Sequence, residues 1–193
     1  MLLYAFLRFN FAEAACVGSN QFMYWNPNDP NSWVSPDGFV CFCGPDWRFD
    51  SWKIWEQGIP EVAVEIIDSI DFPPGWVAPK PWDVRLASYS RIGVRELVRF
   101  EPDAVQPLRV WDRVADALVE RELERSCAYS PSLRGYWLVI DDPDDGPTLR
   151  LSRDERGMEL FLTATEDASR RADLAVIRAS CVPRRAAICR NGQ

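Results

Sequence analysis

The sequence predicts an α/β or α+β domain built around a mixed β-sheet. Its predicted elements follow the order helix, strands, helix, strands and helix, and a strand–helix–strand unit covers about residues 61–100. The 193 residues are 47% hydrophobic and 12% aromatic, which is enough apolar material for a sizeable core. This size fits one globular domain with a decorated end, or a domain with a small appendage.

The N-terminal stretch, residues 1–15, predicts an amphipathic helix. Apolar side chains recur there at a spacing of four, at Leu3, Leu7 and Phe11. Arg8 and Asn10 interrupt the apolar run and a basic leading segment is lacking, which argues against a signal peptide. Because no run is long and apolar enough to span a bilayer, we expect a cytoplasmic protein without membrane contact.

Strands are predicted where β-branched and aromatic residues cluster between turn signals. The predicted strands cover residues 21–25, 38–43, 61–67, 94–100, 107–114, 135–140, 148–152 and 158–163. Residues 116–126 fit either a strand or a helix. Residues 44–60 predict a connection rich in Trp, Gly and Pro, and four prolines exclude a regular element from residues 71–81.

Two further helices are predicted, at residues 82–93 and 165–180. The first shows apolar residues at helical spacing and ends at Gly93, a residue that suits a helix stop. The second begins with a Thr-Glu-Asp cap. We therefore expect a single domain over residues 1–164, followed by a C-terminal helix and basic tail over residues 165–193.

The charge balance restricts the available chemistry. A net charge of −7 is not typical of a protein that coats nucleic acid, although it does not exclude a local basic site. The chain has no His, which removes the commonest general base and zinc ligand. Acid–base or metal chemistry would have to use carboxylates, thiols, Tyr, Lys or backbone atoms.

The six cysteines form no C-x-x-C pair. Cys41 and Cys43 fall on one face of the strand predicted at 38–43, where the geometry for a local disulfide is poor. We expect reduced and mostly buried thiols. A thiolate metal site that uses Cys41 and Cys43 with distant partners is the remote alternative.

A carboxylate interrupts the apolar stretch "PEVAVEIID" at residues 60–68. Strand alternation places Glu65 on the face opposite Val62, Val64 and Ile66. Asp37 stands at the mouth of the preceding strand. Two adjacent strands could bring both acids together with the Ile66 carbonyl, which would make a hard oxygen site suited to Mg²⁺ or Mn²⁺. The alternative is that Asp37 caps a turn and Glu65 faces solvent on an edge strand.

Several segments keep the order and character of a known family. They include "SPDGFVCF", "RFDSWKIWEQGIPEVAVEII", "YSRIGVRELVRFEPD", "LRGYWLV" and "RGMELFLT". From about residue 18 to about residue 164 the chain resembles the bacterial Uma family of restriction-endonuclease-like proteins, which have the PD-(D/E)XK nuclease fold. The resemblance implies a restriction-endonuclease-like mixed sheet flanked by helices, with C-terminal β-hairpins and a terminal helix.

The resemblance also implies functional residues. Asp37 and Glu65 stand where the family has its two metal-binding acids. The family's catalytic lysine, four residues before the tyrosine that is Tyr89 here, is replaced by Arg85. Asp68 replaces a serine and more readily marks the strand end than binds an ion, and Lys80 lies beyond two prolines.

The implied function is a metal-dependent endonuclease that hydrolyses DNA phosphodiester bonds with Mg²⁺ or Mn²⁺, as a homodimer. Catalytic roles would fall to Asp37, Glu65 and Arg85, and Asp37, Glu65 and Ile66 would hold the metal. Arginine keeps the charge of lysine but is bulkier and does not give up a proton, so weakened activity is expected. The alternative is a degenerate module that binds or regulates without cutting.

Other conspicuous residues favour structural roles. Trp47, Trp52 and Trp55 could stack on bases but are expected to pack over the sheet. The arginines of the C-terminal region could bind phosphate but are expected to form a solvated helix face and end; they are Arg170, Arg171, Arg178, Arg184, Arg185 and Arg190.

Overall fold

The computed structural model of the protein describes residues 3–43, 50–67, 80–123, 126–143 and 146–180. In this part of the chain a six-stranded sheet has the order β1-β4-β6-β7-β8-β9. Its strands are β1 (Cys16–Gly18), β4 (Gly38–Cys41), β6 (Val62–Ile66), β7 (Glu96–Phe100), β8 (Leu108–Val114) and β9 (Ala117–Glu120).

The central sheet is mixed, as predicted. β6 and β7 are parallel, whereas the other neighbouring pairs are antiparallel. Helix α3 (Trp82–Ile92) lies between β6 and β7 in the sequence, because parallel neighbours need a crossover connection. The helix ends at Gly93, whose φ of 94° is left-handed and whose N–H donates to the Tyr89 carbonyl, 3.1 Å away. The strand–helix–strand prediction and the helix stop are confirmed.

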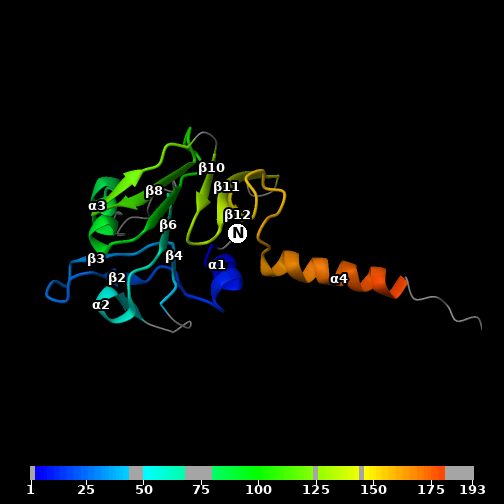
Figure 1. Ribbon diagram of the computed structural model, residues 1–193, viewed down its shortest axis with the longest axis horizontal. Helices are drawn as coiled ribbons and strands as arrows, with labels where there is room; N and C mark the ends of the chain where they lie inside the picture. Colours follow the sequence, from blue (N-terminus) through cyan, green and yellow to red (C-terminus); the bar gives the residue numbers. More distant parts are fainter. Residues whose placement is uncertain (1–2, 44–49, 68–79, 124–125, 144–145, 181–193) are drawn as a thin grey trace, which may run out of the picture.

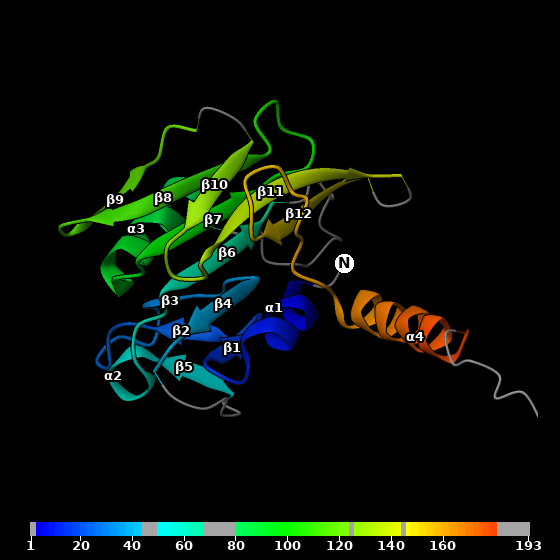
Figure 2. The same ribbon diagram turned by 45° about the vertical axis from the view of Figure 1, so that its right-hand side comes forward.

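Two layers cover the sheet, one on each face (Figures 1 and 2). On one face lie α1 (Leu3–Phe11) and a sheet formed by β10 (Cys127–Ser130), β11 (Gly135–Asp142) and β12 (Gly146–Ser152). On the other lie α3 and a small sheet formed by β2 (Phe22–Tyr24), β3 (Trp33–Val34) and β5 (Ser51–Lys53), which α2 (Ile54–Gln57) follows. This α+β arrangement confirms the predicted fold class, including the C-terminal hairpins.

The residues of β6 alternate between the two cores. Val62 and Val64 belong to the core beneath α1, whereas Ala63 belongs to the core beneath α3. All three are fully buried because β6 lies between β4 and β7 with a layer on each face. Strand alternation therefore puts Glu65 on the face opposite Val62 and Val64, as the sequence predicted, and this is the face beneath α3.

Some sequence predictions were wrong or incomplete. Residues 158–163 form only one isolated bridge, Leu160 with Ser152, because Asp154 accepts backbone N–H groups of the preceding turn and Gly157 turns the chain with a φ of 73°. The ambiguous stretch 116–126 contains the strand β9. Five short elements were not predicted: β1, β3, β5, β10 and α2.

The tryptophans of the 44–60 connection differ from one another. Trp52 is buried, with its ring centroid 4.9 Å from that of Phe39, which confirms a core role. Trp55 is 44% exposed, so the packing role predicted for it was wrong; it lies in α2, a helix of only one turn with no buried residue. Trp47 lies outside the described residues.

The predicted C-terminal helix is present as α4 (Ala164–Ser180) and extends away from the sheets in both views (Figures 1 and 2). Its start is a reciprocal cap: Thr163 N donates to Glu166 Oε2 at 2.7 Å, and Glu166 N donates to Thr163 Oγ1 at 3.2 Å. Residues 181–193, with the tail arginines Arg184, Arg185 and Arg190, lie outside the described part. Among the described residues, no helix is both long and apolar enough to cross a membrane.

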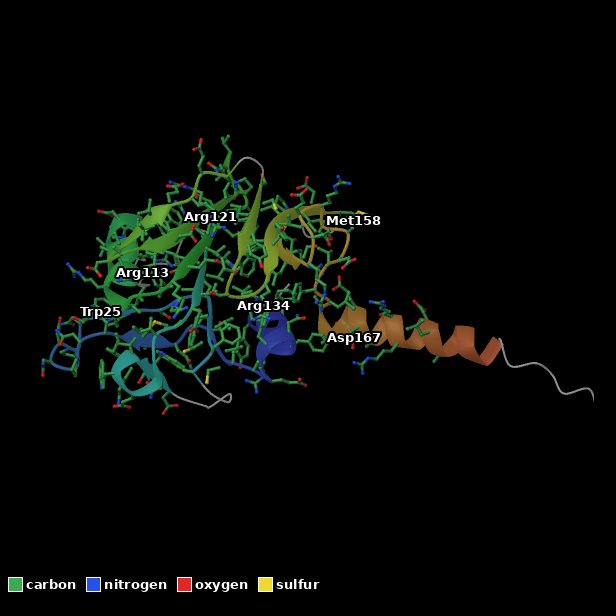
Figure 3. The ribbon with its side chains drawn as sticks, viewed as in Figure 1. Trp25, Arg113, Arg121, Arg134, Met158 and Asp167 are labelled. Atoms are coloured by element: carbon green, nitrogen blue, oxygen red, sulfur yellow. The ribbon has the colours of Figure 1, made fainter. Side chains whose placement is uncertain are left out.

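A buried carboxylate joins the central sheet to the β10–β12 sheet. Glu96 in β7 is 2% exposed, and its Oε1 accepts a hydrogen bond from Trp137 Nε1 at 2.9 Å. Arg121, which Figure 3 labels, has Nη2 3.9 Å from Glu96 Oε2, too far for a hydrogen bond. Burial dominates and raises the pKa of Glu96 to about 6, against the lowering effects of Trp137, Ser130 and Arg121.

We predict that Glu96→Gln becomes more stable relative to the unsubstituted protein as the pH rises. The raised pKa means that ionised Glu96 opposes folding, by about 2 kcal/mol above pH 6. This cost begins near the ordinary glutamate pKa and is absent at lower pH, where the carboxyl is neutral in both states. Urea unfolding of both proteins at pH 4 and pH 7.5 measures the difference, and a pH-independent difference would contradict the pKa assignment.

Candidate functional site

Asp37, directly before β4, comes together with Glu65 in the neighbouring antiparallel strand β6. The β4–β6 register pairs Gly38 with Val64, which continues to Asp37 opposite Glu65. The Asp37 carboxylate, Oδ2, accepts the backbone N–H of Ile66 at 2.7 Å. The expected cap therefore exists, but it spans two strands, and it holds the Asp37 side chain beside the end of β6.

Glu65 is fully buried. The alternative of a solvent-facing edge position was wrong, because β6 has a hydrogen-bonded neighbour on each side. Arg85 Nε donates to Glu65 Oε1 at 3.1 Å, and Arg85 Nη2 donates to Oε2. The hydroxyl of Tyr89 also donates to Oε1. Both carboxylate oxygens of Glu65 thus have partners.

Helix α3 supplies both of these partners. Arg85 and Tyr89 are four residues apart, so they project from one face of the helix toward the sheet. Arg85 is only 14% exposed, and Tyr89 is fully buried. Burial of this helix face against β6 therefore brings a permanent positive charge and a hydroxyl donor onto Glu65.

Burial is the largest influence on the pKa values of Asp37 and Tyr89. Desolvation raises the pKa of Asp37, while the Ile66 N–H and the Arg85 charge act in the lowering direction. Burial raises the pKa of the Tyr89 hydroxyl well above its ordinary value; Arg85 opposes this shift and Asp37 adds to it. Tyr89 is therefore a hydrogen-bond donor at neutral pH and not a base.

The donor set fits a divalent ion on one condition. Two carboxylates on adjacent strands are suitable hard ligands. Glu65, however, already bonds Arg85 through both oxygens, so an ion between the acids has to compete with the Arg85 guanidinium for this carboxylate. In the described residues, no group of three or more Asp, Glu, Cys or His side chains is placed to hold a metal. A third protein ligand would have to be backbone, and the Ile66 carbonyl stays a prediction in that role.

The neighbouring positions singled out in the sequence lie elsewhere. Lys80 donates from Nζ to the Trp33 carbonyl at 2.9 Å and lies 4.3 Å from the centroid of that indole ring. These contacts place its ammonium group at Trp33 in β3 and not at the acid pair. Lys80 therefore does not occupy the position of the missing lysine. Asp68 lies outside the described residues.

Two residues near the acids were not identified as functional candidates from the sequence. Tyr89 served only as a motif position, although its spacing of four from Arg85 could have indicated a shared helix face. Arg99 is the register partner of Glu65 in β7 and therefore lies beside it on the α3 face. Its guanidinium bonds Glu101 at 2.5 Å and lies 4.7 Å from the Trp82 ring centroid. A basic residue alternating with apolar ones in "LVRF" was the available signal.

Comparisons with known proteins assign no family. No family model matches the chain, and no curated protein matches it. One solved structure with a related backbone is described as "a putative nuclease belonging to DUF820" from Anabaena variabilis. It shares 13% identity over 67% of this chain and 68% of that chain, with a TM-score of 0.44. This likeness is too distant to carry an argument, and membership of the Uma family stays a prediction.

We predict that the effects of substituting Glu65 and Arg85 on the free energy of unfolding are strongly non-additive. Arg85→Met should lower the free energy of unfolding by about 3 kcal/mol at pH 7, because it leaves a fully buried carboxylate without its cation. Combining it with Glu65→Gln should recover most of this loss, since the neutral amide no longer needs a counter-charge. Urea unfolding followed by tryptophan fluorescence measures each variant.

Arg109→Met is the matched control. Arg109 also forms a two-pronged pair, with Glu120, but both side chains are more than a third exposed. Its loss should cost under about 1 kcal/mol. If the effects of Arg85→Met and Glu65→Gln simply add, the buried ion pair does not have the role described above.

Proposed function

We propose that this protein is a weak metal-dependent endonuclease that hydrolyses DNA phosphodiester bonds with Mg²⁺ or Mn²⁺ at the Asp37–Glu65 pair. The observation that carries the proposal is the convergence of Asp37, Glu65 and Arg85 from the start of β4, from β6 and from α3. Two acids beside one fixed cation are the groups needed to bind a divalent ion and to neutralise a phosphate.

Asp37 and Glu65 would hold the ion, with the Ile66 carbonyl as the proposed third ligand. Such an ion polarises a phosphoryl oxygen and lowers the pKa of bound water. Arg85, once it releases Glu65, has the planar fork that binds two phosphate oxygens. Tyr89 would continue to donate to Glu65 and fix its orientation.

The same contacts are the reason to expect weak activity. A fully buried carboxylate that loses a guanidinium must gain another cation, so the metal ion and Arg85 compete for Glu65. Arginine also stays protonated and cannot act as a general base. Part of the binding free energy of the ion is therefore used to break the ion pair.

One observation favours a second function, a nuclease-like module that binds DNA without cutting it. Arg85 and Tyr89 together bond both oxygens of Glu65, which leaves a neutralised site without any metal. In that case the proposed homodimer would bind DNA through basic side chains near the sheet, and Asp37 would only brace β6.

We predict that Mn²⁺ binding and plasmid nicking both depend on Glu65 and are limited by Arg85. Glu65→Gln and Asp37→Asn should abolish nicking and weaken Mn²⁺ binding in calorimetry. Arg85→Lys should raise the nicking rate about tenfold, equivalent to ~1.4 kcal/mol, because lysine has one compact charge and releases a carboxylate oxygen more easily.

Glu120→Gln is the control, because Glu120 belongs to a comparable carboxylate–arginine pair at the exposed β8–β9 edge. It should leave both measurements unchanged. Nicking that survives Glu65→Gln would reject the site. If the unsubstituted protein and Arg85→Lys both bind DNA but not Mn²⁺, the second function, DNA binding without cleavage, is supported instead.

A further inference from the structure

Cys41 and Cys43 form a close pair of thiols away from the acid site. Their sulfur atoms are 2.8 Å apart, with Cys41 donating its S–H to Cys43. Cys41 is fully buried and Cys43 is exposed. The pair therefore combines one protected sulfur with one that reagents can reach.

The end of β4 explains this approach. In a continuing strand, residues two apart lie about 6.6 Å from each other with parallel side chains, and this was the basis for expecting poor disulfide geometry. Instead β4 ends at Cys41 and the chain turns at residues 42–43. Glu61 stabilises the turn, because its Oε2 accepts the Phe42 N–H at 2.8 Å.

The surroundings keep both sulfurs in place. Cys41 Sγ also lies 3.5 Å from the Ile59 carbonyl. A Cβ atom at Gly58 would lie 3.3 Å from Cys43 Cβ, so the glycine backbone packs closely against that side chain. Gly58 has a φ of 97°, and its carbonyl accepts a hydrogen bond from Trp52 Nε1 at 2.8 Å. The buried Trp52 therefore holds the Gly58 backbone in place beside the two thiols.

We propose that Cys41 and Cys43 are a redox-active dithiol that low-molecular-weight disulfides convert reversibly to an intramolecular disulfide. Bond formation requires the sulfurs to approach by only about 0.8 Å, from 2.8 Å to the ordinary S–S length. The proposal is independent of nuclease activity.

The order of steps follows from exposure. The Cys43 thiolate attacks one sulfur of the small disulfide, whose S–S bond breaks and releases one thiolate. The Cys41 thiol then loses its proton to water and attacks Cys43 Sγ, and the mixed disulfide breaks to release the second thiolate. Two protein thiols are oxidised, and one small disulfide is reduced to two thiols that take up the two protons.

Cys41 is suited to the second step only. Burial raises the pKa of the Cys41 thiol far above its usual range, and the neighbouring Cys43 adds to this effect. Cys41 is therefore not a thiolate when a reagent arrives. It becomes an effective attacker only when Cys43 is already bonded to a leaving group close by. Cys16 is its rival partner, because the β1–β4 register places Cys16 directly opposite Cys41.

The test uses the full chain in the Cys16→Ala background. No Lys or Arg occurs between residues 9 and 47, so trypsin releases residues 9–48 with Cys41 and Cys43 as the only cysteines. The reduced protein is equilibrated with glutathione and glutathione disulfide at increasing ratios, quenched in acid and alkylated. Mass spectrometry of this peptide should show the loss of two hydrogens and no bound glutathione.

Two variants and a control make the result decisive. Adding Cys41→Ala should leave a stable glutathione adduct on Cys43, because the resolving thiol is gone, and adding Cys43→Ala should leave Cys41 without an adduct in the folded protein. Cys127→Ser, in β10, should change nothing in this peptide. A lasting glutathione adduct on Cys43 with Cys41 present, or a fully reduced pair when Cys43 of the Cys41→Ala protein is modified, would overturn the proposal. A Cys16–Cys41 link in the unsubstituted protein would do the same.

Discussion

Glu65 places an ionisable carboxyl group in the middle of a sheet that is covered on both faces. Taking a carboxylate out of water costs several kcal/mol even after relaxation, unless a cation and hydrogen-bond donors replace the lost water. Arg85 and Tyr89 provide these replacements. Much of the architecture around β6 can be understood as the means of bringing those two side chains to Glu65.

Helix α3 can reach Glu65 only because β6 and β7 are parallel. A parallel pair requires a crossover, and the crossover helix lies over the strand face that carries Ala63 and Glu65. Gly93, in the left-handed conformation, ends the helix, and the chain then returns to β7. The register with Gly38 then puts Asp37 at the same point from the opposite side. The site is thus a consequence of topology and register together, and a slip of one residue in β6 would turn Glu65 toward the α1 core.

The sequence revealed those features that have a local pattern. Alternation in "VAVEI" predicted the strand and the face of Glu65, and helical spacing with Gly93 predicted α3 and its end. Short elements such as β1 and β5 were missed because strands of three residues carry too little pattern, and their hydrogen bonds come from distant segments. The strand predicted at residues 158–163 is the opposite case. Its sequence has a strand-like pattern, but only one of its residues pairs with another strand.

The candidate site was predictable as a list of residues but not as a set of contacts. The positions of Asp37, Glu65 and Arg85 followed from motifs, whereas the two-pronged Arg85–Glu65 pair depends on how deeply α3 is buried. That pair changes the chemical question. A lysine in place of Arg85 could neutralise Glu65 through one oxygen and leave the other for a metal, but the guanidinium fork matches both oxygens at once. The same geometry that makes arginine a good phosphate ligand makes it a good permanent partner for a carboxylate. Activity at this site therefore depends on whether a divalent ion and a phosphate together offer Glu65 and Arg85 better partners than each already has in the other.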